Sequence, residues 1–152
     1  LTVSEKKNFT KSKFGEFHPG GNIGSKFLKV KDIMHSGKNI PLACEHSSMK
    51  NVIIEISKKN FGCIGIINKE KNLCGIITDG DLRRHMKTDI LNKKAKDVMS
   101  KRPKIISKYN YVSDALKIIN EFKITSLFVI NPNLNNKPIG IIHLHDCLRV
   151  DQ

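Results

Sequence analysis

The sequence predicts an α+β protein made of two copies of one small β-α-β-β-α unit, related by pseudo-twofold symmetry. The main observation is an internal repeat. Lys31–Met34 (KDIM) recurs 65 residues later as Lys96–Met99 (KDVM), and Gly75–Ile77 (GII) recurs at the same offset as Gly140–Ile142. Self-similarity of this kind is typical of duplicated structural units.

The predicted elements follow in the same order in both copies. The first long helix has apolar residues at i, i+3, i+4 and i+7, which places them on one face. These residues are Met49, Val52, Ile53 and Ile56 in the first copy, and Val112, Ala115, Leu116 and Ile119 in the second. Ser48 and Asn110 are candidate N-caps for the two helices.

Each of these helices is followed by a predicted hairpin and a short helix. Apolar runs at Cys63–Ile67 and Leu127–Ile130 lead into turn-forming segments and then into second apolar runs. The expected turns cover 68–72 and 131–137, the short helices 81–86 and 146–150, and a polar linker 87–94.

A unit of about 60 residues buries too little surface to be stable by itself. We therefore expect the repeats, placed at 30–90 and 91–152, to pair through their apolar sheet faces. Ligand clefts are expected where strand ends and helix starts of the two copies converge.

Composition and charge bear on several function classes. The net charge of +13 suggests nucleic-acid binding, but only four of the 27 basic residues are Arg, there is no Trp, and Lys is scattered along the chain. Base recognition and base stacking rely on Arg and aromatic residues. Because these residues are scarce here, we do not favour nucleic-acid binding. No apolar run could cross a bilayer, and we expect a soluble cytoplasmic protein. Without C-x-x-C pairs, the four cysteines are expected to be reduced and buried.

The segment Gly75–Asp81 (GIITDGD) resembles the ligand motif of the cystathionine-β-synthase (CBS) repeat, and the pair resembles a Bateman module. In that family the carboxylate commonly binds a ribose diol, and the hydroxyl contacts phosphate or ribose. The resemblance assigns these roles to Asp81 and Thr78. An ionised carboxylate also suits vicinal hydroxyl donors chemically. The structural alternative is that Thr78 ends a strand and Asp81 caps a helix.

The second copy departs from this motif, because His143 replaces the hydroxyl residue and is followed by His145 and Asp146. By the resemblance, His143 and Asp146 are the second candidate ligand-binding pair. Their cleft binds a different ligand or none. The two histidines lie two residues apart, but no third metal ligand has suitable spacing, so we predict no metal site.

Longer strings are similar to the C-terminal region of bacterial arabinose-5-phosphate isomerases. These strings are DIMHSG, GIITDGDLRRH, KITSLFVIN and HLHDCLRV. Phe17–Gly24 (FHPGGNIG) resembles the end of the sugar isomerase (SIS) domain of those enzymes. The resemblance gives His18 a catalytic role in the complete enzyme, which interconverts ribulose 5-phosphate and arabinose 5-phosphate for lipopolysaccharide (Kdo) synthesis. The alternative for His18 is an ordinary loop position.

The resemblance implies a regulatory module rather than a complete enzyme. Residues 1–29 are expected to be the end of an upstream SIS domain whose catalytic part is absent from this chain, which begins with Leu1. The module would bind a nucleotide or a nucleotide-sugar such as CMP-Kdo, require no cofactor, and associate as a homo-oligomer through its CBS pairs. An empty scaffold that holds subunits together is the alternative.

Overall fold

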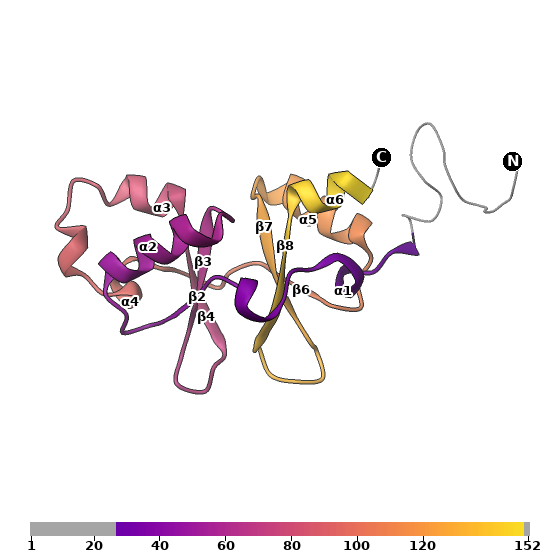
Figure 1. The fold of residues 1–152 in the computed structure, drawn as a ribbon, viewed down its shortest axis with the longest axis horizontal. Helices are drawn as coiled ribbons and strands as arrows, with labels where there is room; N and C mark the ends of the chain where they lie inside the picture. Colours follow the sequence, from indigo (N-terminus) through magenta and orange to yellow (C-terminus); the bar gives the residue numbers. More distant parts are fainter. Residues whose placement is uncertain (1–26, 151–152) are drawn as a thin grey trace, which may run out of the picture.

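A computed structural model describes residues 27–150, which form two lobes side by side (Figure 1). Each lobe is a small sheet with helices on it, so the α+β prediction is confirmed. The first lobe contains β2 (Leu42–Cys44), α2 (Met49–Lys59), β3 (Cys63–Ile67), β4 (Leu73–Thr78) and α3 (Asp79–Arg84). The second contains β6 (Ile105–Ser107), α5 (Val112–Phe122), β7 (Ser126–Ile130), β8 (Pro138–His143) and α6 (Leu144–Val150).

The two sheets repeat the same topology and register. In each, a parallel pair (β2 with β3, β6 with β7) is followed by an antiparallel hairpin (β3 with β4, β7 with β8). The register shifts at equivalent points, between Ile66 and Ile67 and between Val129 and Ile130. Thr78 faces Cys63 and His143 faces Ser126, so the ends of β4 and β8 are equivalent positions.

The long helices begin and end for reasons visible in the sequence. Ser48 caps α2 by accepting the Asn51 N–H at 3.3 Å, as predicted. For α5 the predicted cap was wrong by one residue. The N-cap is Tyr111, whose N–H donates to Asp114 at 2.9 Å, while the Asn110 amide also donates to Asp114. Both helices end at a residue with left-handed backbone, Asn60 and Lys123.

A leading segment precedes the first strand of each repeat, and it packs on the lobe of the other repeat. Residues 29–39 contain α1 (Val30–Ile33) and the turn η2 (Gly37–Asn39). Their first part lies on the second lobe, where Val30 joins the core and His35 exchanges two backbone hydrogen bonds of 2.9 Å with Ile141, whereas the Lys38 carbonyl oxygen of η2 accepts a hydrogen bond from the Lys59 ammonium of the first lobe.

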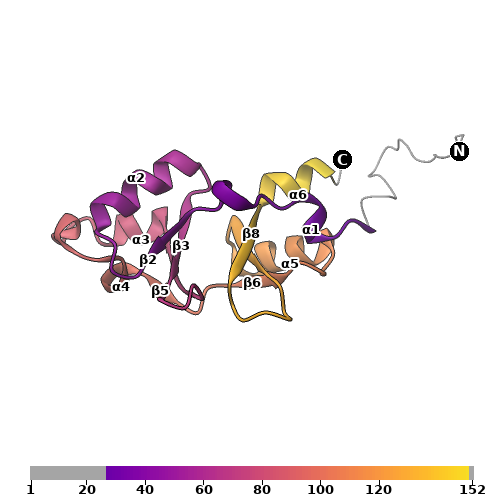
Figure 2. The ribbon, with the colours of Figure 1, turned by 60° about the horizontal axis from the view of Figure 1, so that its bottom comes forward.

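Residues 94–104 cross in the opposite direction. After η3 (Ile90–Asn92), α4 (Ala95–Val98) joins the core of the first lobe, and β5 (Ser100–Lys101) adds a strand beside β4. Figures 1 and 2 both show α1 beside the second lobe and α4 beside the first. Each lobe therefore contains residues of both repeats. The sequence predicted two contiguous repeats and did not indicate this exchange.

The motifs that define the repeat meet at this crossing. A Cβ on Gly140 would lie 2.5 Å from Met34 Sδ and 3.0 Å from the His35 carbonyl oxygen, and one on Gly75 would collide with Met99. Each methionine of the KDIM and KDVM motifs thus packs on the glycine of the other repeat's GII motif. Only glycine leaves room for this contact.

A further core cluster joins the two sheets, as the pairing argument predicted. It consists of Cys63, Leu73, Phe128 and Ile141, all buried. Gly65 of β3 gives Phe128 its space, because a Cβ there would lie 2.9 Å from the Phe128 ring. No described helix has the length and apolar character needed to cross a membrane.

The cysteines follow the prediction only in part. All four are free thiols. Cys63 and Cys147 are buried, and burial raises the pKa of Cys63 to about 12 and that of Cys147 to about 11. Cys74 is partly buried. Cys44 is exposed, because it ends a short strand at the lobe surface, and a hydrogen bond from Ser47 lowers its pKa.

We expect Gly140→Ala to lower the free energy of unfolding by about 1–3 kcal/mol, because its methyl group overlaps Met34 and the His35 backbone. Gly80→Ala is the matched control. Its Cβ would meet nothing closer than 3.5 Å, and alanine is favoured over glycine in a helix. Urea unfolding measures both. If Gly140→Ala and Gly80→Ala lowered the free energy of unfolding equally, the packing of Met34 on Gly140 would be contradicted.

We expect iodoacetamide at pH 8 to modify Cys44 first and Cys63 and Cys147 last. The thiolate is the reactive form, and a lowered pKa gives more thiolate at this pH than a raised one. Peptide mapping by mass spectrometry gives the order of modification, and Cys44→Ser should remove the fast phase. Modification of Cys63 as fast as Cys44 would contradict its burial.

Candidate ligand-binding cavity between the repeats

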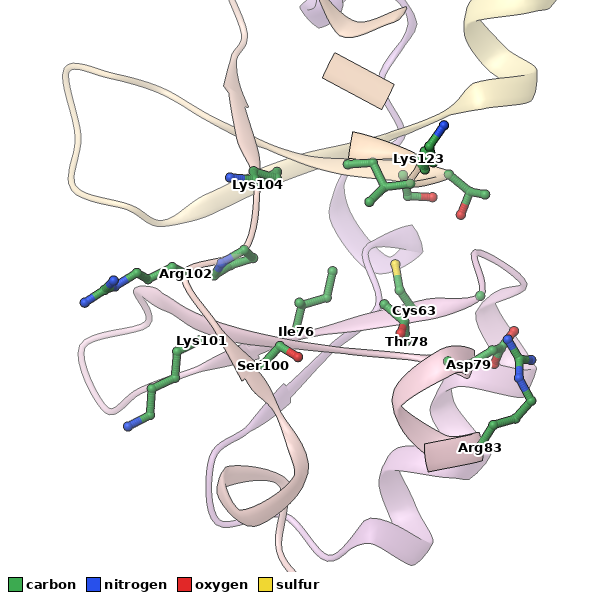
Figure 3. A pocket seen from close by; sticks show the side chains of 16 residues that line it. Cys63, Ile76, Thr78, Asp79, Arg83, Ser100, Lys101, Arg102, Lys104 and Lys123 are labelled. Carbon is green, nitrogen blue, oxygen red and sulfur yellow. The ribbon is translucent and has the colours of Figure 1, made fainter. Parts of the chain in front are cut away.

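A cavity of about 520 Å³ lies where the end of β4, the segment after β5 and the start of β7 meet (Figure 3). We call it the basic cavity. It draws its walls from both repeats, because the 94–104 segment crosses to the first lobe. Its lining comprises Gly62, Cys63, Ile76, Thr78, Asp79, Gly80, Arg83, Ser100, Lys101, Arg102, Pro103, Lys104, Lys123, Ile124, Thr125 and Ser126.

The lining combines an apolar and hydroxyl-bearing centre with a charged rim. Figure 3 shows Ile76, Cys63 and Thr78 in the middle of the view. Five cationic residues line the cavity, against one carboxylate, that of Asp79. The cations are Arg83, Lys101, Arg102, Lys104 and Lys123, all with exposed side chains. The cavity therefore suits an anionic ligand that also has an apolar part.

Thr78 lies at the cavity and Asp81 lies behind it. Thr78 accepts the Asp81 N–H at 3.2 Å and donates its hydroxyl proton to Asp81 Oδ2 at 3.1 Å, so the pair forms a capping box for α3. Asp81 is 4% exposed and is not part of the cavity lining. The ligand-binding role implied by the family and the helix-capping alternative both require Thr78 and Asp81 to lie close together, and they do.

Donors already surround the Asp81 carboxylate. Oδ2 accepts from the Thr78 N–H at 2.9 Å and from its hydroxyl, while Oδ1 accepts from the Arg84 guanidinium and from Ser100 Oγ at 3.2 Å. A ligand diol could reach this carboxylate only by displacing one of these donors. Ligand binding by Asp81 stays a prediction, and its observed contacts are those of a cap that also orients two hydroxyl groups.

The equivalent position in the second lobe is built from aromatic rings. Asp146 is again buried and bound by Arg149, at 2.6 Å, and by the His143 N–H, at 2.9 Å. His35 occupies the place of Ser100 and contacts Asp146 through Nε2 at 2.9 Å. Phe61 packs edge-on against His35 with ring centroids 5.1 Å apart.

We call His35, Phe61, His143 and His145 the His–Phe cluster. The His143 and His145 rings lie 4.6 Å apart, and the His145 N–H donates to His143 Nδ1 at 3.0 Å. Burial, followed by the neighbouring His145, lowers the pKa of His143 and favours its neutral form. Ligand binding by His143 and Asp146 stays a prediction. Within residues 27–150, no three His, Cys, Asp or Glu side chains are grouped to hold a metal ion.

Sequence reasoning missed several residues of these two sites. Asp79, Arg102 and Lys123 line the basic cavity, and His35 contacts Asp146. Asp79 lay inside the motif already quoted and could have been found there. Arg102 and His35 reach these sites through the crossing of the leading segments, and Lys123 through the turn after α5. The sequence carries no direct signal for either feature. His18 lies outside the described residues.

Comparison with known proteins agrees with this architecture. The CBS domain family model matches residues 30–88 and 95–152. Arabinose 5-phosphate isomerase KdsD of Yersinia pestis is 36% identical over 152 residues, which cover 98% of this chain and 45% of that protein. An uncharacterised protein of Rickettsia prowazekii is 42% identical over 96% of this chain and 45% of its own length. The chain thus spans less than half the length of these relatives.

Solved CBS-pair structures share the fold. CBSX2 in complex with AMP superposes with a TM-score of 0.69 at 21% identity, covering 80% of this chain and 94% of that one. The CBS domain pair of MJ0100, in complex with 5′-methylthioadenosine and S-adenosyl-L-methionine, gives 0.71 at 20% identity over 82% and 95%. PAE2072 of Pyrobaculum aerophilum, complexed with AMP, gives 0.69 at 16% identity over 78% and 89%. Two family matches, a duplicated register and a shared core together show that this chain belongs to the CBS domain family as a tandem pair.

Proposed function

We propose that this chain is the regulatory part of an arabinose-5-phosphate isomerase and that it binds a nucleotide or nucleotide-sugar in the basic cavity. The observation that carries the proposal is the cavity itself, which joins an apolar wall, hydroxyl oxygens, one carboxylate and several cations. The relatives named KdsD and the AMP complexes of CBSX2 and PAE2072 support it.

The hydrogen-bond network sets what the hydroxyl groups can do. A hydroxyl has one proton and two acceptor lone pairs. Thr78 and Ser100 both direct their protons to Asp81, which leaves acceptor capacity on each oxygen. Ribose hydroxyl groups are donors, so they can bind these two oxygens and the exposed Asp79 carboxylate. Asp81 then acts as a positioning residue.

The rest of a nucleotide fits the remaining surfaces. Ile76, Pro103 and Ile124 offer an apolar wall for the base, and the cations of the rim offer partners for phosphate. A CMP-sugar such as CMP-Kdo contains each of these parts. Catalysis belongs to an upstream SIS domain, with His18 at its end, and this chain alone should not isomerise sugar phosphates.

Occupancy of the cavity would couple to that domain through residues 29–39. This segment follows the proposed SIS end directly and packs on the second lobe, whose β7 start also lines the cavity. A ligand that contacts both lobes would therefore affect the position of residues 29–39, which lead to the catalytic domain.

We expect Thr78→Val to weaken nucleotide binding about 3- to 10-fold through loss of one hydrogen-bond acceptor. Thr78→Ser should restore it, and Thr88→Val, at an exposed position outside the cavity lining, should leave it unchanged. Calorimetric titration with AMP, CMP, ATP and CMP-Kdo measures the affinities. If the wild-type chain bound none of the four compounds, the proposal would be overturned and the alternative of an empty scaffold that holds subunits together would be favoured. Weakening by His143→Ala alone would move the site to the second lobe.

We expect Asp79→Asn and Asp81→Asn to separate ligand binding from stability. Asp81 is buried among four donors, so Asp81→Asn should lower the free energy of unfolding by about 1–3 kcal/mol. Asp79→Asn, at an exposed position, should weaken ligand binding and leave urea unfolding unchanged. Loss of binding in Asp81→Asn at unchanged stability would show instead that Asp81 contacts the ligand directly.

A further inference from the structure

We infer that Phe61 couples the basic cavity to residues 29–39, so that a ligand in the cavity holds this leading segment on the second lobe. The inference rests on the proposed function and adds the residue through which the ligand acts on the chain that leads to the upstream domain. Phe61 lies in the turn that ends α2, between Asn60 and Gly62. This turn contacts both the cavity and the leading segment.

On one side the turn forms part of the cavity wall. Gly62 lines the basic cavity directly, and a Cβ there would lie 3.4 Å from Oδ2 of Asp79, another lining residue. Ser126 also lines the cavity, and its hydroxyl donates to the Phe61 carbonyl oxygen at 3.4 Å. The backbone of Phe61 is therefore held between two residues that a bound ligand would contact.

On its other side the turn contacts the leading segment at two places. The Phe61 ring packs edge-on against the His35 ring, with centroids 5.1 Å apart. Two residues before Phe61, the Lys59 ammonium donates to the Lys38 carbonyl oxygen. Figure 2 shows the leading segment passing from α1, beside the second lobe, to β2 of the first. The end of α2 thus meets this segment where it crosses between the lobes.

His35 fastens the leading segment to the second lobe. Its backbone exchanges two hydrogen bonds of 2.9 Å with Ile141, and its Nε2 contacts Asp146 at 2.9 Å. The ring therefore has Phe61 of the first lobe on one side and Asp146 of the second on another. Edge-on packing of aromatic rings depends on their orientation, so the position of Phe61 affects how firmly His35 is held.

The second repeat shows that the fold does not require an aromatic ring here. Ile124 is equivalent to Phe61, because each directly follows the left-handed residue that ends the long helix of its repeat. Ser100 occupies the place of His35. The contact between two rings is therefore particular to the leading segment that follows the proposed upstream domain.

Coupling between two sites is reciprocal. If a bound nucleotide holds Phe61 against His35, loss of the His35 ring must lower nucleotide affinity, although His35 does not line the cavity. Substitution of either ring should then have the same effect, and substitution of both should add nothing, because each removes the same contact.

The test is calorimetric titration of AMP, CMP, ATP and CMP-Kdo into the wild-type chain, His35→Ala, Phe61→Ile and the double variant. Isoleucine is the residue at the equivalent position, so the backbone accommodates it. Each single substitution should weaken binding about 5-fold, the lower end of typical coupling between sites, and the double variant should bind no more weakly than the single ones. His46→Ala, which removes an exposed histidine outside the cavity lining, should bind like the wild-type chain.

Amide hydrogen exchange followed by NMR gives a readout that a merely structural role of Phe61 would not move. In the wild-type chain, saturating nucleotide should slow exchange of the His35 N–H, which donates to the Ile141 carbonyl oxygen. In Phe61→Ile the same amide should exchange equally fast with and without nucleotide.

Three results would overturn the inference and leave nucleotide binding intact. They are unchanged affinity in His35→Ala, additive weakening in the double variant, and exchange at His35 that nucleotide does not slow. Weakening by His46→Ala as large as that by His35→Ala would also overturn it. If the wild-type chain bound none of the four compounds, both the inference and the proposed function would be overturned.

Discussion

The contact between methionine and glycine across the two repeats is the constraint on which the remaining structure depends. Met34 packs on Gly140 and Met99 packs on Gly75, in space that a Cβ would occupy. Through these contacts each leading segment completes the core of the other repeat's lobe. Neither lobe is then a complete unit without the chain of its neighbour, which is consistent with the small size of each repeat.

The same crossing creates the cavity. It carries Ser100–Lys104 to the edge of β4, where Ser100 donates to Asp81 and the segment lines the same cavity as Thr78. In the second lobe the crossing brings His35 to Asp146, and Phe61 packs against His35. One duplicated geometry therefore yields a basic cavity in one place and an aromatic cluster in the other. The side chains at a few equivalent positions account for the difference.

The sequence predicted the elements well because their signals are local. The apolar stripes of α2 and α5, the hairpin turns and the Ser48 cap each depend on neighbouring residues. The role of Thr78 and Asp81 as partners at a strand end was also visible. The crossing was not, because a leading segment can pack on either lobe with the same apolar pattern. Exposed Cys44 was missed for a related reason, since a three-residue strand does not fix which of its side chains are buried.

We expect the exchanged segments to join the two repeats into a single cooperative body. Urea unfolding followed through the NMR signals of the Ile66 and Ile142 methyl groups tests it most directly, since these residues lie in the separate cores of the two lobes. Loss of both signals at one urea concentration is expected. Retention of native signal from one methyl group after the other has been lost would contradict the claim.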